Sequence, residues 1–207
     1  MGLRTGDTRK IFHFSIFTCA TVLSLTLGIG AVNLLGGLMA LYVFTVAREG
    51  EGNLLFEGIA RESDAPRRGL YVVVPFLSTA LGGILSVHCF GSLAAVGFVA
   101  SGWGDAVAEP VGIRWGRHRY RVPNIGGIPG SSRSWEGTGA VFLASLVGVA
   151  LVLGPGGLAP DHSLPALLLV AAAVAAASAL VEAVSHHGLD NLTVPLAASG
   201  VAKLLGA

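Results

Sequence analysis

The chain has 207 residues, of which 53% are hydrophobic and only 12% are charged, and its formal net charge is +1. Its mean hydropathy of +0.72 excludes an ordinary soluble domain. It also makes a nucleic-acid-binding role a poor fit. A bilayer core about 30 Å thick needs roughly 20 apolar residues per helix, and such stretches recur along the chain between short polar breaks. We therefore predict an all-α polytopic membrane helix bundle, with residues 1–207 forming a single domain.

Seven membrane spans are predicted in chain order. They cover residues 11–27, 31–47, 69–87, 90–109, 136–153, 164–184 and 191–205. Only a small-residue turn around Gly28 and Gly30 separates the first two, and the last span is short and contains Pro195. Two cations precede the first apolar run, but no small-residue cleavage site ends it, so no cleavable signal peptide is expected.

The charged residues divide unequally between the two sides of this predicted topology. Of the 13 Lys and Arg residues, all except Lys203 fall on the side that holds the N-terminus. The positive-inside rule therefore predicts a cytoplasmic N-terminus and an outer C-terminus in the cell membrane. Of the 12 acidic residues, all except Asp161 also fall on the cytoplasmic side. We expect the active face there, built from residues 1–13, 48–68, 101–136 and 182–191.

Two acids stand near the cytoplasmic end of the fourth predicted span. Asp105 and Glu109 are four residues apart and therefore share one face of a helix. An unpaired acid at the bilayer centre costs about 2.5–3.5 kcal/mol on insertion scales. One interpretation is that both acids end the helix and reach into water, paired with Arg114 or Arg117.

A second polar group lies at the same predicted depth, which favours a functional site. Its members begin or end the neighbouring spans: Glu136, Glu182, Asp190 and Asn191. Carboxylates at one depth with arginines above them are typical of a divalent-metal and phosphate site. A basic cytoplasmic face also fits simple attraction to anionic lipid headgroups. The stretch "GGIPGSSRSWEG" lacks the lysine of a P-loop, and no dinucleotide-binding GxGxxG follows a strand.

Four segments carry a resemblance to a known family. They are "RKIFHF" at 9–14, "GDAVAEPVGIRWGRHR" at 104–119, "SRSWEG" at 132–137 and "VEAVSHHGLDNLTVP" at 181–195. They resemble RKxxH, GDAxAxxxGxxxG, K-S-x-E-G and E…G-x-D-N…P of the CTP-dependent lipid kinases, which include dolichol kinase, phytol kinase and the prokaryotic diacylglycerol/polyprenol kinases. They occur in the family's order. Arg133 stands where the family more usually has lysine.

The resemblance implies that the γ-phosphate of CTP is transferred to the hydroxyl of a membrane lipid alcohol on the cytoplasmic side, with Mg²⁺ as cofactor. The acceptor is phytol, geranylgeraniol, a polyprenol or dolichol, or diacylglycerol. The implied catalytic residues are Asp105, Asp190 and Glu136. The implied metal ligands are Asp105, Glu109 and Glu182. The implied nucleotide- and phosphate-binding residues are Arg9, Lys10, His13, Arg117, Arg119, Arg133, Ser134 and Asn191.

Two alternatives stay open at this point. "SWEG" is also similar to the K-T-W-E-G of CDP-diacylglycerol synthases, which use CTP in a cytidylyltransferase reaction, although their C-terminal signature is missing and Asp190–Asn191 favours the kinases. A non-enzymatic transporter should instead have charged or broken helices near the midplane. The Gly- and Ala-rich fifth and sixth spans permit close helix packing, which would allow a homodimer. Residues 53–64 are predicted to form a short interfacial or linker helix.

Overall fold

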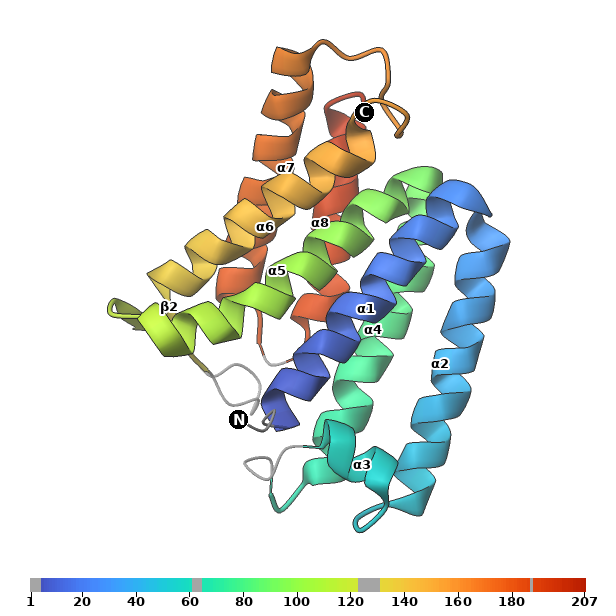
Figure 1. The fold of residues 1–207 in the computed structure, drawn as a ribbon, viewed down its shortest axis with the longest axis vertical. Coiled ribbons are helices and arrows are strands. Elements are labelled where there is room, and N and C mark those ends of the chain that lie inside the picture. The colour runs from blue at the N-terminus through green and yellow to red at the C-terminus, as the bar shows by residue number, and fades with distance from the viewer. Residues whose placement is uncertain (1–4, 61–64, 123–130, 187) are drawn as a thin grey trace.

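A computed structural model describes residues 5–60, 65–122, 131–186 and 188–207. Seven long helices dominate it (Figure 1): α1 (Thr5–Thr26), α2 (Ile29–Glu49), α4 (Arg68–Phe90), α5 (Ala94–Trp115), α6 (Trp135–Leu153), α7 (Leu164–Val184) and α8 (Asp190–Leu204). The shorter elements are α3 (Leu54–Ile59), the 3₁₀ turn η2 (Gly91–Leu93) and the strands β1 (Arg119–Arg121) and β2 (Ser132–Ser134). Each predicted span coincides with one of the long helices.

Four stretches are long and apolar enough to cross a membrane. They are α2, the 48-residue stretch Arg68–Trp115 that contains both α4 and α5, α6 and α7. The prediction of an all-α membrane bundle is thus supported, with two three-residue strands as its only described β-structure. Helices α1 and α8 are not among the four stretches, and α8 has only 15 residues. Seven crossings and the orientation of the termini stay predictions.

Helix α5 lies at the centre of the bundle, because its first nine residues are buried and eight of them are small or β-branched. All side chains from residue 94 to residue 102 are buried. A side chain at Gly97 would collide with the backbone of Pro195 in α8, and one at Gly102 would collide with Phe17 in α1. Gly104 likewise contacts α6. Glycine lets helices approach each other closely, so α5 can contact three neighbours at once.

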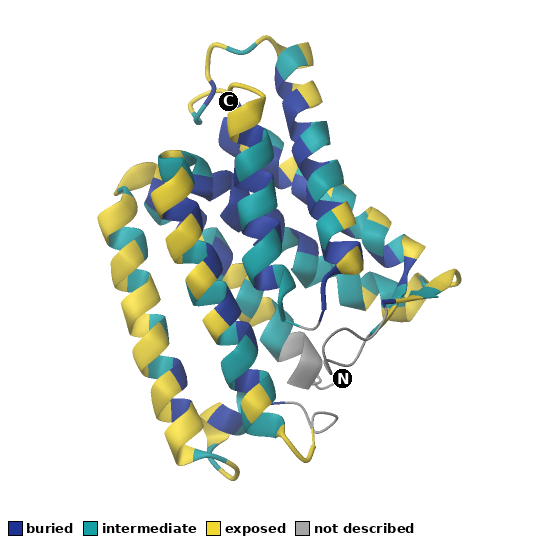
Figure 2. Cartoon of the chain, turned by 180° about the vertical axis from the view of Figure 1, so that it is seen from behind, coloured by how far each residue is buried: buried dark blue, intermediate teal, exposed yellow. Residues whose placement is uncertain are grey.

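The main hydrophobic core fills the space between α5, α6, α7 and α8, and Val96, Val149, Val174 and Ala198 are among its fully enclosed residues. Helix α2, by contrast, is mostly exposed. Its apolar residues Leu34, Leu41 and Phe44 are each at least 63% exposed, and Figure 2 shows exposed positions along the whole length of α2, the outermost helix. A long apolar helix with this exposure fits contact with lipid tails.

The connection from α5 to α6 is a small antiparallel hairpin, in which Arg119 pairs with Ser134 and Arg121 with Ser132. Helix α5 continues through Pro110 to Trp115, beyond the predicted end of the span at residue 109. The glycines of this segment therefore serve packing rather than a helix break. The predicted short helix after residue 53 is confirmed as α3, which begins where the Leu55 N–H donates to Asn53 Oδ1 at 2.8 Å. Residues 61–64 of that prediction lie outside the described residues.

Candidate active site

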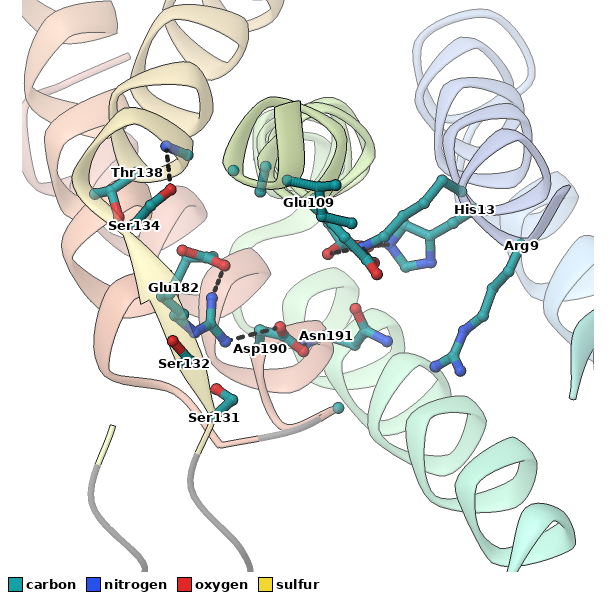
Figure 3. Close-up of a pocket in the computed structure, with 18 of the residues that line it drawn as sticks. Arg9, His13, Glu109, Ser131, Ser132, Ser134, Thr138, Glu182, Asp190 and Asn191 are labelled. Atoms are coloured by element: carbon teal, nitrogen blue, oxygen red, sulfur yellow. Dashed lines mark hydrogen bonds and ion pairs between the residues drawn. The ribbon is translucent and has the colours of Figure 1, made fainter. Parts of the chain in front are cut away.

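A polar cavity of about 330 Å³ opens at one end of the bundle. The beginning of α1, the final turns of α5 and α7, the beginning of α8 and the β hairpin all contribute to its wall. Figure 1 places these segments at the same end of the molecule, opposite the C-terminus. Four segments that are widely separated in the sequence therefore meet around one space (Figure 3).

One side of the cavity is an ion cluster between α1 and α5. Lys10 Nζ lies 2.6 Å from Asp105 Oδ1 and 3.5 Å from Glu109 Oε2. His13 Nε2 lies 3.6 Å from the other carboxylate oxygen of Asp105. The side chains of Lys10 and Asp105 are only 14% and 22% exposed. The one-turn spacing of Asp105 and Glu109 on α5 thus lets a single lysine serve both carboxylates.

A second ion cluster lies on the opposite side, centred on Arg133 of β2. One terminal nitrogen of its guanidinium contacts Glu182 at the end of α7. The other donates to the Ser185 carbonyl at 3.0 Å and lies 3.6 Å from Asp190 Oδ2. Glu182 is only 6% exposed. Because guanidinium presents several donors in a fixed plane, one arginine holds the end of α7, the following turn and the start of α8 together.

The two clusters are in electrostatic range of each other, since Asp190 interacts with both Asp105 and Lys10 as well as with Arg133. Asn191, the next residue, is buried and donates from its side chain to the Pro75 carbonyl of α4 at 3.4 Å. This contact ties the start of α8 to α4. Among the described residues, four cations and four acids line the cavity: Arg9, Lys10, Arg119, Arg133, Asp105, Glu109, Glu182 and Asp190. The formal charges of these described residues balance.

All but two of the predicted site residues line this cavity. The two exceptions are Glu136 and Arg117. Glu136 faces the turn between α5 and β1, where its carboxylate accepts hydrogen bonds from the His118 backbone N–H at 3.2 Å and interacts with His118 Nδ1 at 2.8 Å. Arg117 is exposed and does not line the cavity. The geometry thus gives Glu136 a structural contact at the hairpin.

The serines of "SSRS" have unequal environments, which the sequence did not reveal. Ser134 lines the cavity but its hydroxyl caps α6 by accepting from the Gly137 N–H at 3.1 Å. Ser131 also lines the cavity, and its buried hydroxyl has no hydrogen-bond partner. Thr138, another lining residue absent from the predicted set, bonds the Tyr120 hydroxyl at 2.7 Å. The sequence does not tell a buried serine from an exposed one in a Ser-rich run. The register of β2 makes Ser134 buried and Ser132 exposed.

The predicted metal ligands divide between the two clusters. Asp105 and Glu109 face Lys10, whereas Glu182 contacts Arg133. Among the residues that the structure describes, no three His, Cys, Asp or Glu side chains are grouped closely enough to hold a metal ion by themselves. Magnesium is commonly held by one or two carboxylates together with substrate phosphates. The oxygen donors present suit such a shared site, and a magnesium site stays a prediction.

The fold and the cavity together define the class of protein: a membrane helix bundle with a charge-balanced polar site at one end. The chain is 42% identical over 123 residues to a phytol kinase of Synechocystis sp.. The aligned region covers 59% of this chain and 48% of the relative, so the match spans about half the length of that protein. No family model matches the chain, and no solved structure matches it.

Proposed function

We propose that this protein is a lipid kinase that transfers the γ-phosphate of CTP to the hydroxyl of a membrane prenol, with phytol as the first candidate. The observation that carries the proposal is the meeting of segments around one cavity. Each of the four segments that resemble lipid-kinase motifs contributes residues to its wall. The similarity to a protein named phytol kinase supports the acceptor class.

The chemistry of phosphoryl transfer suits a site of this composition. The lipid hydroxyl oxygen attacks the γ-phosphorus, the bond from that phosphorus to the β,γ-bridging oxygen breaks, and CDP leaves with that oxygen. Catalysis depends mainly on positioning and on neutralising the negative charge of the phosphates. The four cations of the cavity would serve the triphosphate, and its place at the end of an apolar bundle would allow a lipid hydroxyl to reach it from the membrane.

The carboxylates have two proposed roles, proton transfer and metal binding. Asp105 is held by Lys10 and faces His13, so its orientation is set before substrate arrives. We assign it the proton of the lipid hydroxyl, with Asp190 as the alternative acceptor of that proton. Bound magnesium would neutralise phosphate charge. Asp105 and Asp190 would hold it, with Glu109 and Glu182 as neighbouring carboxylates.

A label-transfer assay tests the proposed function. Purified protein with Mg²⁺ and γ-labelled CTP or ATP is offered phytol, geranylgeraniol, a polyprenol and diacylglycerol in parallel. Label in a prenol from CTP but not from ATP is the expected result. Label reaching the lipid from ATP alone would refute CTP as donor, and transfer to diacylglycerol alone would refute the prenol acceptor. If α-labelled CTP instead marks phosphatidic acid, the cytidylyltransferase reaction replaces the kinase.

A further inference from the structure

Two tryptophans and two arginines are exposed together outside the cavity, where α5 leads into the hairpin and α6 begins. Trp115 and Trp135 are 60% and 62% exposed, and Arg114 and Arg117 are exposed as well. The Arg114 guanidinium lies over the Trp115 ring, 5.8 Å from its centroid. The Trp135 N–H donates to the His118 carbonyl at 3.0 Å, so Trp135 lies beside the turn that carries Arg117. We call Arg114, Trp115, Arg117 and Trp135 the tryptophan–arginine surface, and none of them lines the cavity.

This surface carries positive charge that nearby acids do not neutralise. Within the described part of the chain, no carboxylate forms an ion pair with Arg114 or Arg117. Glu136, which follows Trp135 in the sequence, is engaged with His118 instead. A surface of one sign attracts a partner of the opposite sign, so the partner of this surface is anionic.

The outward face of α6 indicates what kind of anionic partner lies there. Residues four apart share a face of a helix, and the series that begins at Trp135 is exposed at every step, at Gly139, Leu143, Val147 and Leu151. Its three apolar side chains are each at least 54% exposed, which fits contact with lipid tails. From the first to the last residue of this series the helix rises about 24 Å, close to the roughly 30 Å of a bilayer core. Trp135 therefore lies where the lipid-contacting face ends, at the depth of the headgroups.

Tryptophan and arginine both suit that depth. The amphipathic ring of tryptophan is enriched at membrane–water interfaces, and guanidinium groups bind phosphate oxygens such as those of phospholipid headgroups. Figures 1 and 2 both show the hairpin projecting sideways from the bundle. A residue at its base can therefore contact the surrounding bilayer. A soluble polyanion would account for the arginines, but it would not account for exposed rings in line with a lipid-contacting face.

We infer that the tryptophan–arginine surface binds the headgroups of anionic phospholipids, with Trp115 and Trp135 inserted at the membrane interface. The partner is the surrounding bilayer, because the surface continues the lipid-contacting face of α6. This inference goes beyond the proposed function and does not depend on it, since none of the four residues lines the cavity. Arg117, which the motif resemblance placed among the nucleotide-binding residues, binds lipid phosphate instead.

Fluorescence quenching by brominated phospholipids tests the inference. The protein is reconstituted in mixed bilayers of phosphatidylcholine and phosphatidylglycerol, in which only one of the two lipids has chains brominated near the headgroup. Trp103→Phe is the background, because the emission then comes from Trp115 and Trp135 alone, and the chain that retains Trp103 is measured in parallel. We expect the lipid beside the two tryptophans to be enriched about threefold or more in phosphatidylglycerol. The enrichment should decrease at high salt, because these charges are exposed.

Two double variants separate a local site from a general effect of charge. Arg114→Gln/Arg117→Gln should bring the enrichment close to one. Arg48→Gln/Arg67→Gln is the matched control, since it removes the same charge from exposed positions at the end of α2 and just before α4. This control should retain the enrichment, because Arg48 is followed by Glu49 and Glu51.

Three results would overturn the inference. The first is equal quenching by the two brominated lipids in the protein that carries all its arginines. The second is an equal decrease of the enrichment in both double variants. The third is emission that soluble iodide quenches and neither brominated lipid does, which would place the surface in water or against a protein. Enrichment of phosphatidylglycerol in a protein that phosphorylates no lipid would refute the kinase function alone, and prenol phosphorylation without enrichment would refute the headgroup site alone.

Discussion

Lys10 and Asp105 form an ion pair across 95 residues of sequence, with Lys10 Nζ 2.6 Å from Asp105 Oδ1. The pair joins the first turns of α1 to the middle of α5, and it lies in the wall of the cavity. Both side chains are more than three-quarters enclosed, and the contact between them is the shortest that Lys10 makes with the two carboxylates of α5. The contact therefore both attaches α1 to the central helix and orients the carboxylate to which we assign the proton transfer.

Replacement of the lysine tests that dual role. Lys10→Met leaves Asp105 and Glu109 without their shared cation, and should lower the free energy of unfolding by about 1.5–3 kcal/mol. Misplacement of the carboxylate should lower turnover by about 10²-fold. Thermal unfolding in detergent and the label-transfer assay measure the two effects. Lys10→Arg keeps the charge and should recover part of the stability and part of the turnover. Wild-type turnover in Lys10→Met would show that the pair has no part in the reaction.

The carboxylates of Asp105 in α5 and Glu136 in α6 should differ in their importance for turnover. Asp105→Asn removes a cavity group held by Lys10, and we expect turnover to fall by at least about 10²-fold while the protein stays folded. Glu136→Gln alters a contact with His118 outside the cavity, and turnover should stay within about tenfold of wild type. Equal losses in the two variants would restore Glu136 to the catalytic set predicted from the sequence.

Arg133 should not tolerate the lysine that is more usual in the motif that "SRSWEG" resembles. Its guanidinium contacts Glu182, Asp190 and the Ser185 carbonyl together, and an ammonium group lacks the planar fork that reaches all three. Arg133→Lys should therefore lower kcat/KM by about tenfold or more. A double-mutant cycle with Glu182→Gln, read by thermal unfolding, measures the coupling. Additive effects in that cycle would contradict a direct interaction.

The glycines of α5 provide a prediction about packing. Gly97→Ala places a methyl group against the Pro195 carbonyl oxygen and the Ser199 hydroxyl of α8, and the backbone oxygen cannot move aside as the hydroxyl can. We expect a loss of about 1–3 kcal/mol in the free energy of unfolding. Gly139→Ala in α6 is the control, since no atom lies near its new methyl group. In thermal unfolding, the stability of Gly139→Ala should be equal to or above that of the wild type. A similar loss of stability in both variants would indicate a general effect of replacing glycine in a helix.

Transient detachment of helix α3 from α4 should become more frequent in acid. Arg68 at the start of α4 donates to both carboxylate oxygens of Glu57, at 3.2 and 2.5 Å, and these bonds, followed by one from the Gly52 N–H, lower the pKa of Glu57. Because the pKa is lowered, the ion pair contributes its full stabilisation of the α3–α4 contact at a pH above the ordinary pKa of glutamate. This stabilisation is lost as the pH falls through the lowered pKa.

Hydrogen exchange of the α3 amides measures this detachment as a function of pH. Protection should be constant near neutral pH and should fall below about pH 4, in the usual range of glutamate titration. Glu57→Gln should show the lower protection at every pH and lose the acid step. An acid step that persists in Glu57→Gln would assign the detachment to another group.

Most of the helical architecture could be predicted from the chain itself. Runs of apolar residues as long as a bilayer is thick have few structural alternatives, because every backbone N–H and C=O must be paired within the segment. The seven long helices coincide with the predicted apolar runs, although α1 and α8 are not among the stretches apolar enough to cross a membrane. The end of α5 was less predictable: the predicted span ends at residue 109, whereas the helix continues to Trp115, with Gly112 packed closely against Ser134.

Most of the predicted residues line the cavity, and they were predicted from the cost of charged residues near a membrane together with the motif resemblance. The sequence did not show which charged residues form ion pairs with each other. Lys10 with Asp105 and Arg133 with Glu182 are contacts between distant segments, and only helix packing brings them within reach. The difference between Ser131 and Ser134 depends on strand register and on one helix cap. Sequence determined the residue types and their depth, whereas tertiary structure decided their partners, because pairing depends on distances that hydropathy does not encode.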